Sequence, residues 1–299
     1  MEAEFYIFKV MKNKVLFLGL LMVFALVTAC SDDDDTSGPV DPEDLILSEI
    51  ATRNLNDGTE TTRVEESFLS GQPYIRYTFE GETVVSKVEF KYNNRGSVES
   101  IKYYYDTRYE EQETFLYDAK NRLIEFYSEN VTAPEMAYYR EFEYPENGTI
   151  IEQQRDNLKE PLPGGRFVYS LNEAGLIYKV ESEDGEVFQA EFEGNQIITV
   201  STPNDGEYTY MYDEVNLDQG DFNKRYYQSI YGADPNNAAL YLSSLLDMPQ
   251  AYADKFLIST ASDQVMLRYD YTFDLQNFPL ERADFDKVVQ TAEVSYTYE

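Results

Sequence analysis

The 299-residue sequence contains no histidine and no tryptophan, and its only cysteine is Cys30. Without histidine, the chain cannot form a serine–histidine triad or a cysteine–histidine dyad, and the usual zinc sites are excluded as well. A single cysteine cannot form an intramolecular disulfide. Any catalysis would therefore depend on carboxylate, hydroxyl, lysine or tyrosine side chains, and we expect no metal and no cofactor.

Basic residues are also scarce, because 24 lysines and arginines stand against 56 aspartates and glutamates, which gives a formal net charge of -32. A charge of this sign repels phosphate backbones, so we expect no nucleic-acid partner. Aromatic residues are abundant instead, with 27 tyrosines and 18 phenylalanines. They occur in short alternating runs, which favour β structure.

The N-terminus carries an apolar run, residues 15–25, that follows lysines at positions 9, 12 and 14. The run is too short to span a bilayer as a stable helix, so we predict that residues 1–29 are a secretory signal peptide. Glu2 and Glu4 are unusual in such a charged region. We therefore expect translation to start at Met11 instead of Met1.

The apolar run leads into Val27-Thr28-Ala29-Cys30, which resembles the bacterial lipobox. The resemblance implies that Cys30 is lipidated, becomes the first residue of the mature protein and attaches it to a membrane. Several acyl chains would make that attachment durable. The alternative is an ordinary buried thiol beside a conventional cleavage site.

A block of polar residues follows the cysteine directly, namely Ser31, Asp32, Asp33, Asp34 and Asp35. It resembles the surface-export signal of Bacteroidota lipoproteins, which implies a lipid-anchored protein of the outer membrane that faces the cell exterior. A solvated spacer and an ion-binding run are the alternatives. Residues 30–44 also contain Gly38, Pro39 and Pro42, so this stretch is predicted to be an acidic, flexible tether.

A short unit recurs in the rest of the chain: an aromatic-x-aromatic pair with Gly or Asn four residues later. The copies are Phe90-Lys91-Tyr92 with Gly96, Phe115-Leu116-Tyr117 with Asn121, Phe142-Glu143-Tyr144 with Gly148, Tyr210-Met211-Tyr212 with Asn216, and Tyr271-Thr272-Phe273 with Asn277; in Phe167-Val168-Tyr169 the glycine, Gly175, comes two residues late. The first four tyrosines are 25, 27 and 25 residues apart. A unit repeated with a fixed turn indicates β-hairpins in which the Gly or Asn takes a left-handed backbone conformation.

Alternation within the strands predicts one aromatic and one charged face. Val88, Phe90 and Tyr92 share one face. Lys87, Glu89 and Lys91 lie on the other. About fifteen such strands would form an antiparallel meander. An aromatic face of that size would not stay in water, so the sheet must curl, close or be covered. We therefore predict a mainly β fold, a large curved and barrel-like meander that forms a single domain over residues 45–299.

One segment, about residues 222–256, interrupts the hairpins and is predicted to be a helical insertion. Asp234 suits the N-cap and Pro235 the first helical position of a helix that runs to Leu246. Its apolar stripe consists of Ala238, Leu242, Leu245 and Leu246. We expect this helix to cover one end or part of the aromatic face as a structural element, and not to gate a catalytic site.

The segment from Tyr117 to Leu123 resembles the tyrosine-aspartate repeat of the Rhs and teneurin shells, with Asn121 where that motif prefers glycine. There are too few copies here to build such a shell. The chain as a whole is similar to Bacteroidota surface lipoproteins of unknown function that are built on a porin-like curved β-sheet. Their ending is similar to residues 271–279 and 295–298. This resemblance implies a fold and a location, and no activity.

The favoured function is a non-catalytic surface module that binds or scaffolds a glycan, a peptide or a partner surface protein, since tyrosine rings can stack on sugars or pack against peptides. No motif identifies the residues that would bind such a ligand. One alternative is a glycosidase-like hydrolase with paired carboxylates, although no motif singles out a pair. Another is a membrane-embedded barrel, which the anchor, the insertion and the many tyrosines all oppose.

Overall fold

The computed structural model describes residues 46–106, 108–146, 148–204, 206–213, 222–243, 246, 249, 252, 256–262, 265–274 and 278–298. The predicted signal peptide and tether, with Cys30 and the acidic run Ser31 to Asp35, lie outside these ranges. Asn216 and Asn277, the expected turn residues of two repeat copies, lie outside them as well.

Eighteen strands of the described ranges form a single antiparallel sheet. The strands are β1 (Leu47–Asn56), β2 (Thr59–Leu69), β3 (Gln72–Glu80), β4 (Thr83–Tyr92), β5 (Val98–Tyr105), β6 (Arg108–Tyr117), β7 (Leu123–Asn130), β8 (Tyr138–Glu143), β9 (Thr149–Arg155), β10 (Pro161–Leu171), β11 (Ile177–Ser182), β12 (Val187–Glu193), β13 (Gln196–Thr202), β14 (Gly206–Tyr212), β15 (Leu257–Ala261), β16 (Met266–Phe273), β17 (Pro279–Asp286) and β18 (Val289–Tyr298). Each strand pairs with its neighbours in sequence. The meander prediction is confirmed, with more strands than the fifteen expected.

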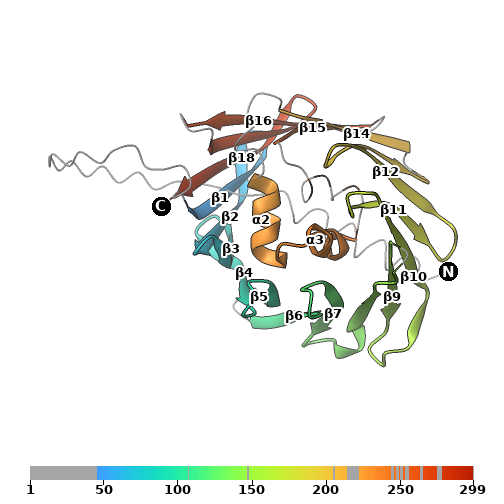
Figure 1. Cartoon of the computed structure of the whole chain (residues 1–299). Coiled ribbons are helices and arrows are strands. Elements are labelled where there is room, and N and C mark those ends of the chain that lie inside the picture. Colours follow the sequence, from blue (N-terminus) through green and yellow to red (C-terminus); the bar gives the residue numbers. More distant parts are fainter. Residues whose placement is uncertain are drawn as a thin grey trace, which may run out of the picture.

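The sheet closes on itself because β1 also pairs with β18, with Leu47 opposite Tyr298 and Asn54 opposite Ala292. Figure 1 shows the resulting ring of strands, in which the blue first strand lies beside the red last one. The fold is therefore a closed antiparallel β-barrel, and closure is the outcome among the three expected, namely a sheet that curls, closes or is covered.

Between β14 and β15, the described residues include two helices that lie inside the ring (Figure 1): α2 (Phe222–Tyr231) and α3 (Pro235–Leu242). The start of α3 is as predicted, because the Asp234 side chain accepts a hydrogen bond from the Asn236 N–H at 2.9 Å and Pro235 follows it. Its end is not: Ser243 takes a left-handed conformation with φ 52°, so α3 ends at Leu242 instead of Leu246. A short 3-10 helix, η2 (Pro134–Met136), lies between β7 and β8.

We call α2 and α3 together the plug. Tyr227, Ile230 and Tyr231 of α2 and Ala238 to Leu240 of α3 are buried in one hydrophobic cluster with the inner side chains of β4 to β14. Phe115 shows how close this packing is, because its ring lies 6.0 Å from that of Tyr231 and 5.6 Å from that of Tyr241. The insertion thus covers part of the aromatic face, as expected, but it does so from within the barrel.

The repeat residues have two distinct roles in the wall. At the turn position, Asn121 has φ 63° and Gly96 has φ 79°, so the predicted left-handed conformation is confirmed. In three copies the second aromatic residue also ties its strand to the start of the preceding one, because the hydroxyls of Tyr92, Tyr144 and Tyr212 donate to the carbonyls of Pro73, Leu123 and Ile197 at 2.6 to 2.7 Å. The Tyr117 hydroxyl is instead buried without a hydrogen-bond partner, and that of Tyr169 donates to Glu152.

The two ends of the barrel differ. We call the end with the turns that follow even-numbered strands the plugged end, because the start of α3 binds two of those turns. The chain enters β1 and leaves β18 at this end. The other end, with the turns that follow odd-numbered strands, is called the open end.

Candidate functional site

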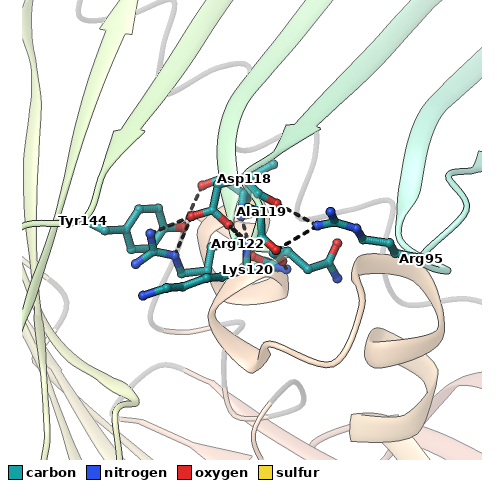
Figure 2. A network of polar contacts seen from close by, with 9 residues as sticks. Arg95, Asp118, Ala119, Lys120, Arg122 and Tyr144 are labelled. Carbon is teal, nitrogen blue, oxygen red and sulfur yellow. Dashed lines mark hydrogen bonds and ion pairs between the residues drawn. The ribbon is translucent and has the colours of Figure 1, made fainter.

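The turn of the tyrosine-aspartate motif is organised by one carboxylate, that of Asp118 (Figure 2). Its Oδ1 accepts hydrogen bonds from the backbone N–H groups of Lys120 at 2.8 Å and Arg122 at 3.0 Å, and its Oδ2 accepts from the Arg122 guanidinium at 2.6 and 2.8 Å. Burial acts to raise the pKa of Asp118, but the bonds from Arg122 and Lys120 outweigh it and lower the pKa. The carboxylate therefore stays ionised and fixes the turn.

Neighbouring turns are joined to it by two arginines (Figure 2). Arg95, from the β4–β5 turn, donates to the carbonyl oxygens of Asp118 at 2.9 Å and Ala119 at 3.2 Å. Arg122 lies over the Tyr144 ring, 4.1 Å from its centroid. These side chains are hydrogen-bonded within the rim of the barrel and join its turns. We therefore assign a structural role to the tyrosine-aspartate motif, residues 117–123.

Two consecutive asparagines at the start of α3 connect the plug to the wall. Asn237 accepts from the Leu123 N–H at 2.7 Å through Oδ1 and donates to the Asn121 carbonyl at 2.9 Å through Nδ2. Asn236 donates to the Gly175 carbonyl at 2.9 Å. No motif of the sequence singles out these two residues, although two amides beside the apolar stripe of a helix are a usable signal for a buried polar contact.

Three arginines lie on the inner face of the wall, each paired with a carboxylate from a neighbouring position. Arg76 binds Glu66 at 2.6 Å, Arg140 binds Glu152 at 2.7 and 2.9 Å, and Arg282 binds Asp284 at 2.6 and 2.8 Å. The first two pairs also reach the plug. Tyr226 of α2 donates to Glu66 at 2.9 Å, and Arg140 donates to the Leu240 carbonyl at the end of α3 at 2.6 Å.

The Arg140–Glu152 pair is the most buried of the three, with side-chain exposures of 5% and 0%. Burial acts to raise the pKa of Glu152, and the charge and hydrogen bonds of Arg140 overcome it, so the pKa is lowered. Tyr169 also donates to Glu152, and burial raises the pKa of this tyrosine strongly. The Arg140 guanidinium in turn places a positive charge at the carbonyl end of α3, where the helix dipole favours one.

A hydrolase would need two carboxyls that titrate differently and can reach a substrate. Glu113 is 1% exposed and accepts hydrogen bonds from Tyr103 at 2.8 Å and Tyr241 at 3.0 Å, so it faces the core. Among the described carboxyls, a raised pKa is found at Glu49, through burial and Glu65, and at Asp234, through burial and Asp118 among its neighbours. Asp234 is the N-cap of α3. Asp234 therefore has a structural role at the start of α3.

Within the described ranges, no group of three or more acidic or cysteine side chains is arranged to hold a metal ion. The stretch from Asp213 to Asp221, whose aspartates could supply oxygen ligands to calcium, lies almost entirely outside those ranges. Of the helices in the described part of the chain, none is both long and apolar enough to cross a membrane.

Partly exposed aromatic side chains of the inner wall occur toward both ends of the barrel, and six of them lie in the half nearer the open end. Phe188 pairs with Val180 and Tyr208 with Val200, and both valines belong to the buried core, so these rings share its face. We call the set the inner aromatic ring: Tyr103, Tyr138, Phe167, Phe188, Tyr208 and Tyr269. Tyr138, Phe188 and Tyr208 lie within the first three residues of strands that start at the open end. Their exposure means that solvent reaches the inside of the wall there.

Aromatic residues on the outer face are arranged differently. Tyr127 and Tyr139 stack with their centroids 4.3 Å apart, and the Lys159 amine lies 4.3 Å from the Tyr139 centroid. Burial and the bond with Tyr139 raise the pKa of Tyr127 to about 12. Likewise, the Lys87 amine lies 4.0 Å from the Tyr104 centroid. Neighbouring side chains therefore occupy faces of these outer rings, so they are poorer platforms for a sugar than the sequence suggested.

No protein-family model and no curated protein matches the chain. Among solved structures, a porin-like protein from Bacteroides uniformis ATCC 8492 has a TM-score of 0.40 at 11% identity, over 85% of this chain and 98% of that chain. A porin-like protein from Bacteroides vulgatus ATCC 8482 has a TM-score of 0.37 at 10% identity, over 86% of this chain and 99% of that chain. The TcdB2-TccC3 structure has a TM-score of 0.25 at 10% identity, over 81% of this chain and 16% of that chain.

Proposed function

We propose that the protein is a non-catalytic lipoprotein of the outer cell surface that binds a glycan, a peptide or a partner protein at the open end of its barrel. The observation that carries the proposal is the inner aromatic ring, whose side chains face inward and are still partly exposed. A protein interior normally buries such rings fully. Aromatic side chains that stay accessible on a concave surface are typical of binding sites.

The plug opposes a role as an open channel, because it shares a continuous hydrophobic core with the wall. The outer face opposes insertion of the barrel in lipid. Ion pairs lie on it within the strands, including Lys87 with Glu89, Lys179 with Glu181 and Arg268 with Asp270. A lipid-facing band of a membrane barrel is apolar, and charges in it are costly. We infer that the barrel is bathed in water and is held to the membrane through Cys30.

The position of the N-terminus favours one orientation. Since the chain enters β1 at the plugged end, a lipid on Cys30 would hold that end toward the membrane. The segment from Cys30 to Ile46 reaches at most about 55 Å when fully extended. The open end, with the inner aromatic ring, would then point away from the membrane toward ligands outside the cell.

The test is a binding screen with the processed protein carrying Cys30→Ser, against glycan arrays and peptide libraries, followed by isothermal titration of each ligand found. We expect Phe188→Ala together with Tyr208→Ala to weaken binding about tenfold, since aromatic residues at the centre of a site contribute most of its affinity. Met211→Ala on the outer face of β14, where the side chain is 58% exposed, is the matched control. If ligands bind and the double variant binds them as tightly as the control does, the assigned site is wrong.

A further inference from the structure

We infer that the ligand of the inner aromatic ring is a peptide segment that presents lysine or arginine side chains. This inference rests on the proposed function and adds the chemistry of the occupant. It is argued from three features of the structure: the environment of the wall's own arginines, the charge of the loops at the open end, and the charge of the whole chain.

The inner wall already binds guanidinium groups in a recurring way. Each of its three arginines pairs with a carboxylate and lies over an inner ring: Arg76 is 5.5 Å from the Phe90 centroid, Arg140 is 5.2 Å from that of Phe142, and Arg282 is 5.4 Å from that of Tyr269. Tyr269 is a member of the inner aromatic ring whose face Arg282 already occupies, so it illustrates the interaction and is not itself a free platform. A cation over an aromatic face is attracted by the quadrupole of the ring. A basic side chain from outside would meet the same chemistry at the exposed rings.

The loops around the open end are acidic. The β11–β12 turn contains Glu183, Asp184 and Glu186 and no basic residue, and Glu80 and Glu82 flank the β3–β4 turn. Between strands, the described turns of the open end contain nine acidic and two basic residues, whereas the described hairpin turns of the plugged end contain four acidic residues, Asp118 among them, and three basic ones, Arg95, Lys120 and Arg122. The turns of the open end are therefore the more negative, and they complement a positively charged partner.

The charge of the whole chain acts in the same direction. A net charge of -32 creates a negative potential around the molecule, which attracts basic ligands. An anionic ligand would be repelled from the opening, and a neutral glycan would gain nothing from the field. A basic peptide would be attracted both by the negative potential and by the aromatic rings.

The test uses the processed protein with Cys30→Ser and a fluorescein-labelled peptide of alternating lysine and glycine, with the corresponding glutamate–glycine peptide as the control ligand. Fluorescence anisotropy should show binding of the lysine peptide alone, weakened about tenfold by a rise from low to high sodium chloride. Phe188→Leu, which keeps an apolar side chain of similar size, should weaken binding about fivefold through loss of the ring quadrupole. Tyr139→Leu on the outer face should leave it unchanged.

The outcomes separate this inference from the proposed function. If the lysine peptide binds equally well to the Phe188→Leu variant and to the unmodified protein, attraction by surface acids explains the binding and the inference is wrong. If a neutral oligosaccharide binds in a Phe188-dependent manner while the lysine peptide does not, the proposed function stands and the cationic ligand is rejected. If neither class of ligand depends on the ring, both proposals fail. A melting temperature within the range of the Tyr139→Leu control shows that each variant is folded.

Discussion

The plugged and open ends of this barrel are built from the same hairpins and use aromatic residues in opposite ways. At the plugged end, Phe115 is 2% exposed and packs against both helices, and the partly exposed Tyr92, Tyr144 and Tyr212 each donate a hydroxyl hydrogen bond to a carbonyl group. At the open end, Phe188 and Tyr208 point inward and remain partly exposed. The difference teaches that stability is concentrated where the wall meets the plug, which leaves the other end free to bind.

The largest effect is expected where the two regions meet, at the buried ion pair. Arg140→Met should lower the free energy of unfolding by about 3–5 kcal/mol, because it leaves the Glu152 carboxylate buried without its cation. Lys179→Met is the control, since Lys179 and Glu181 form an exposed pair of the kind that contributes little. Urea unfolding followed by circular dichroism measures both variants. Equal losses would show that the wall does not depend on the buried pair.

The same pair predicts a loss of stability in acid. The pKa of Glu152 is lowered in the folded protein from the ordinary value of 4.5, so its contribution is complete above that value and is lost as the pH falls through the folded pKa. Urea midpoints measured from pH 7 downward should therefore drop below about pH 4.5 more steeply for the unmodified protein than for Glu152→Gln. Parallel curves would contradict the assignment.

A smaller effect is expected at the amide contact between α3 and the turns. Asn237→Ala leaves the Leu123 N–H and the Asn121 carbonyl without their partner, which should cost about 1–3 kcal/mol. Asn204→Ala, in an exposed turn at the open end, is the control. Thermal melts compare the two. We also expect faster hydrogen exchange at the Leu123 amide in the Asn237 variant, and unchanged exchange there would rule out this contact.

The smallest effect is expected at the turn residue Asn121. Its φ of 63° is costly for a β-branched side chain, so Asn121→Val should destabilise the protein by about 1–2 kcal/mol. Asn121→Gly removes the strain of a positive φ but also removes the hydrogen bond from Nδ2 to the Ser97 hydroxyl at 2.8 Å. Because these two effects oppose each other, the melting temperature of this variant should stay close to that of the unmodified protein. Equal melting temperatures for the two variants would mean that backbone conformation does not decide this site.

The local parts of this fold could be predicted from the sequence, because the signals lie within a few residues of the structure that they specify. The left-handed Asn121, the N-cap Asp234 and the alternation of Val88, Phe90 and Tyr92 are of this kind. Closure of the barrel is not, since Asn54 pairs with Ala292 and no local pattern records that contact. Helix α2 lies within the predicted helical insertion, but its bounds could not be predicted for a similar reason: its tyrosines, asparagine and serine are weak helix formers, and packing inside the barrel stabilises it.

The inner ion pairs had a signal that the sequence analysis did not use. Arg140 is in phase with Tyr138 and Phe142, and Glu152 is in phase with Ile150, so strand alternation alone places both charges on the aromatic face. A charged residue in phase with the core on each of two consecutive strands indicates a buried pair. The inner aromatic ring could not be found in this way, because buried and partly exposed rings have the same period, and only the position of the plug separates them.

The pairing of β1 with β18 has a further consequence. A closed wall has no edge strand, so the barrel offers no unpaired backbone on which another chain could add a strand and begin to aggregate. It also brings the start of β1 and the end of β18 side by side, with Leu47 opposite Tyr298. The same barrel could therefore form from a chain that begins at a different strand. A permuted gene that joined these ends and opened a turn at the other rim would encode the same barrel.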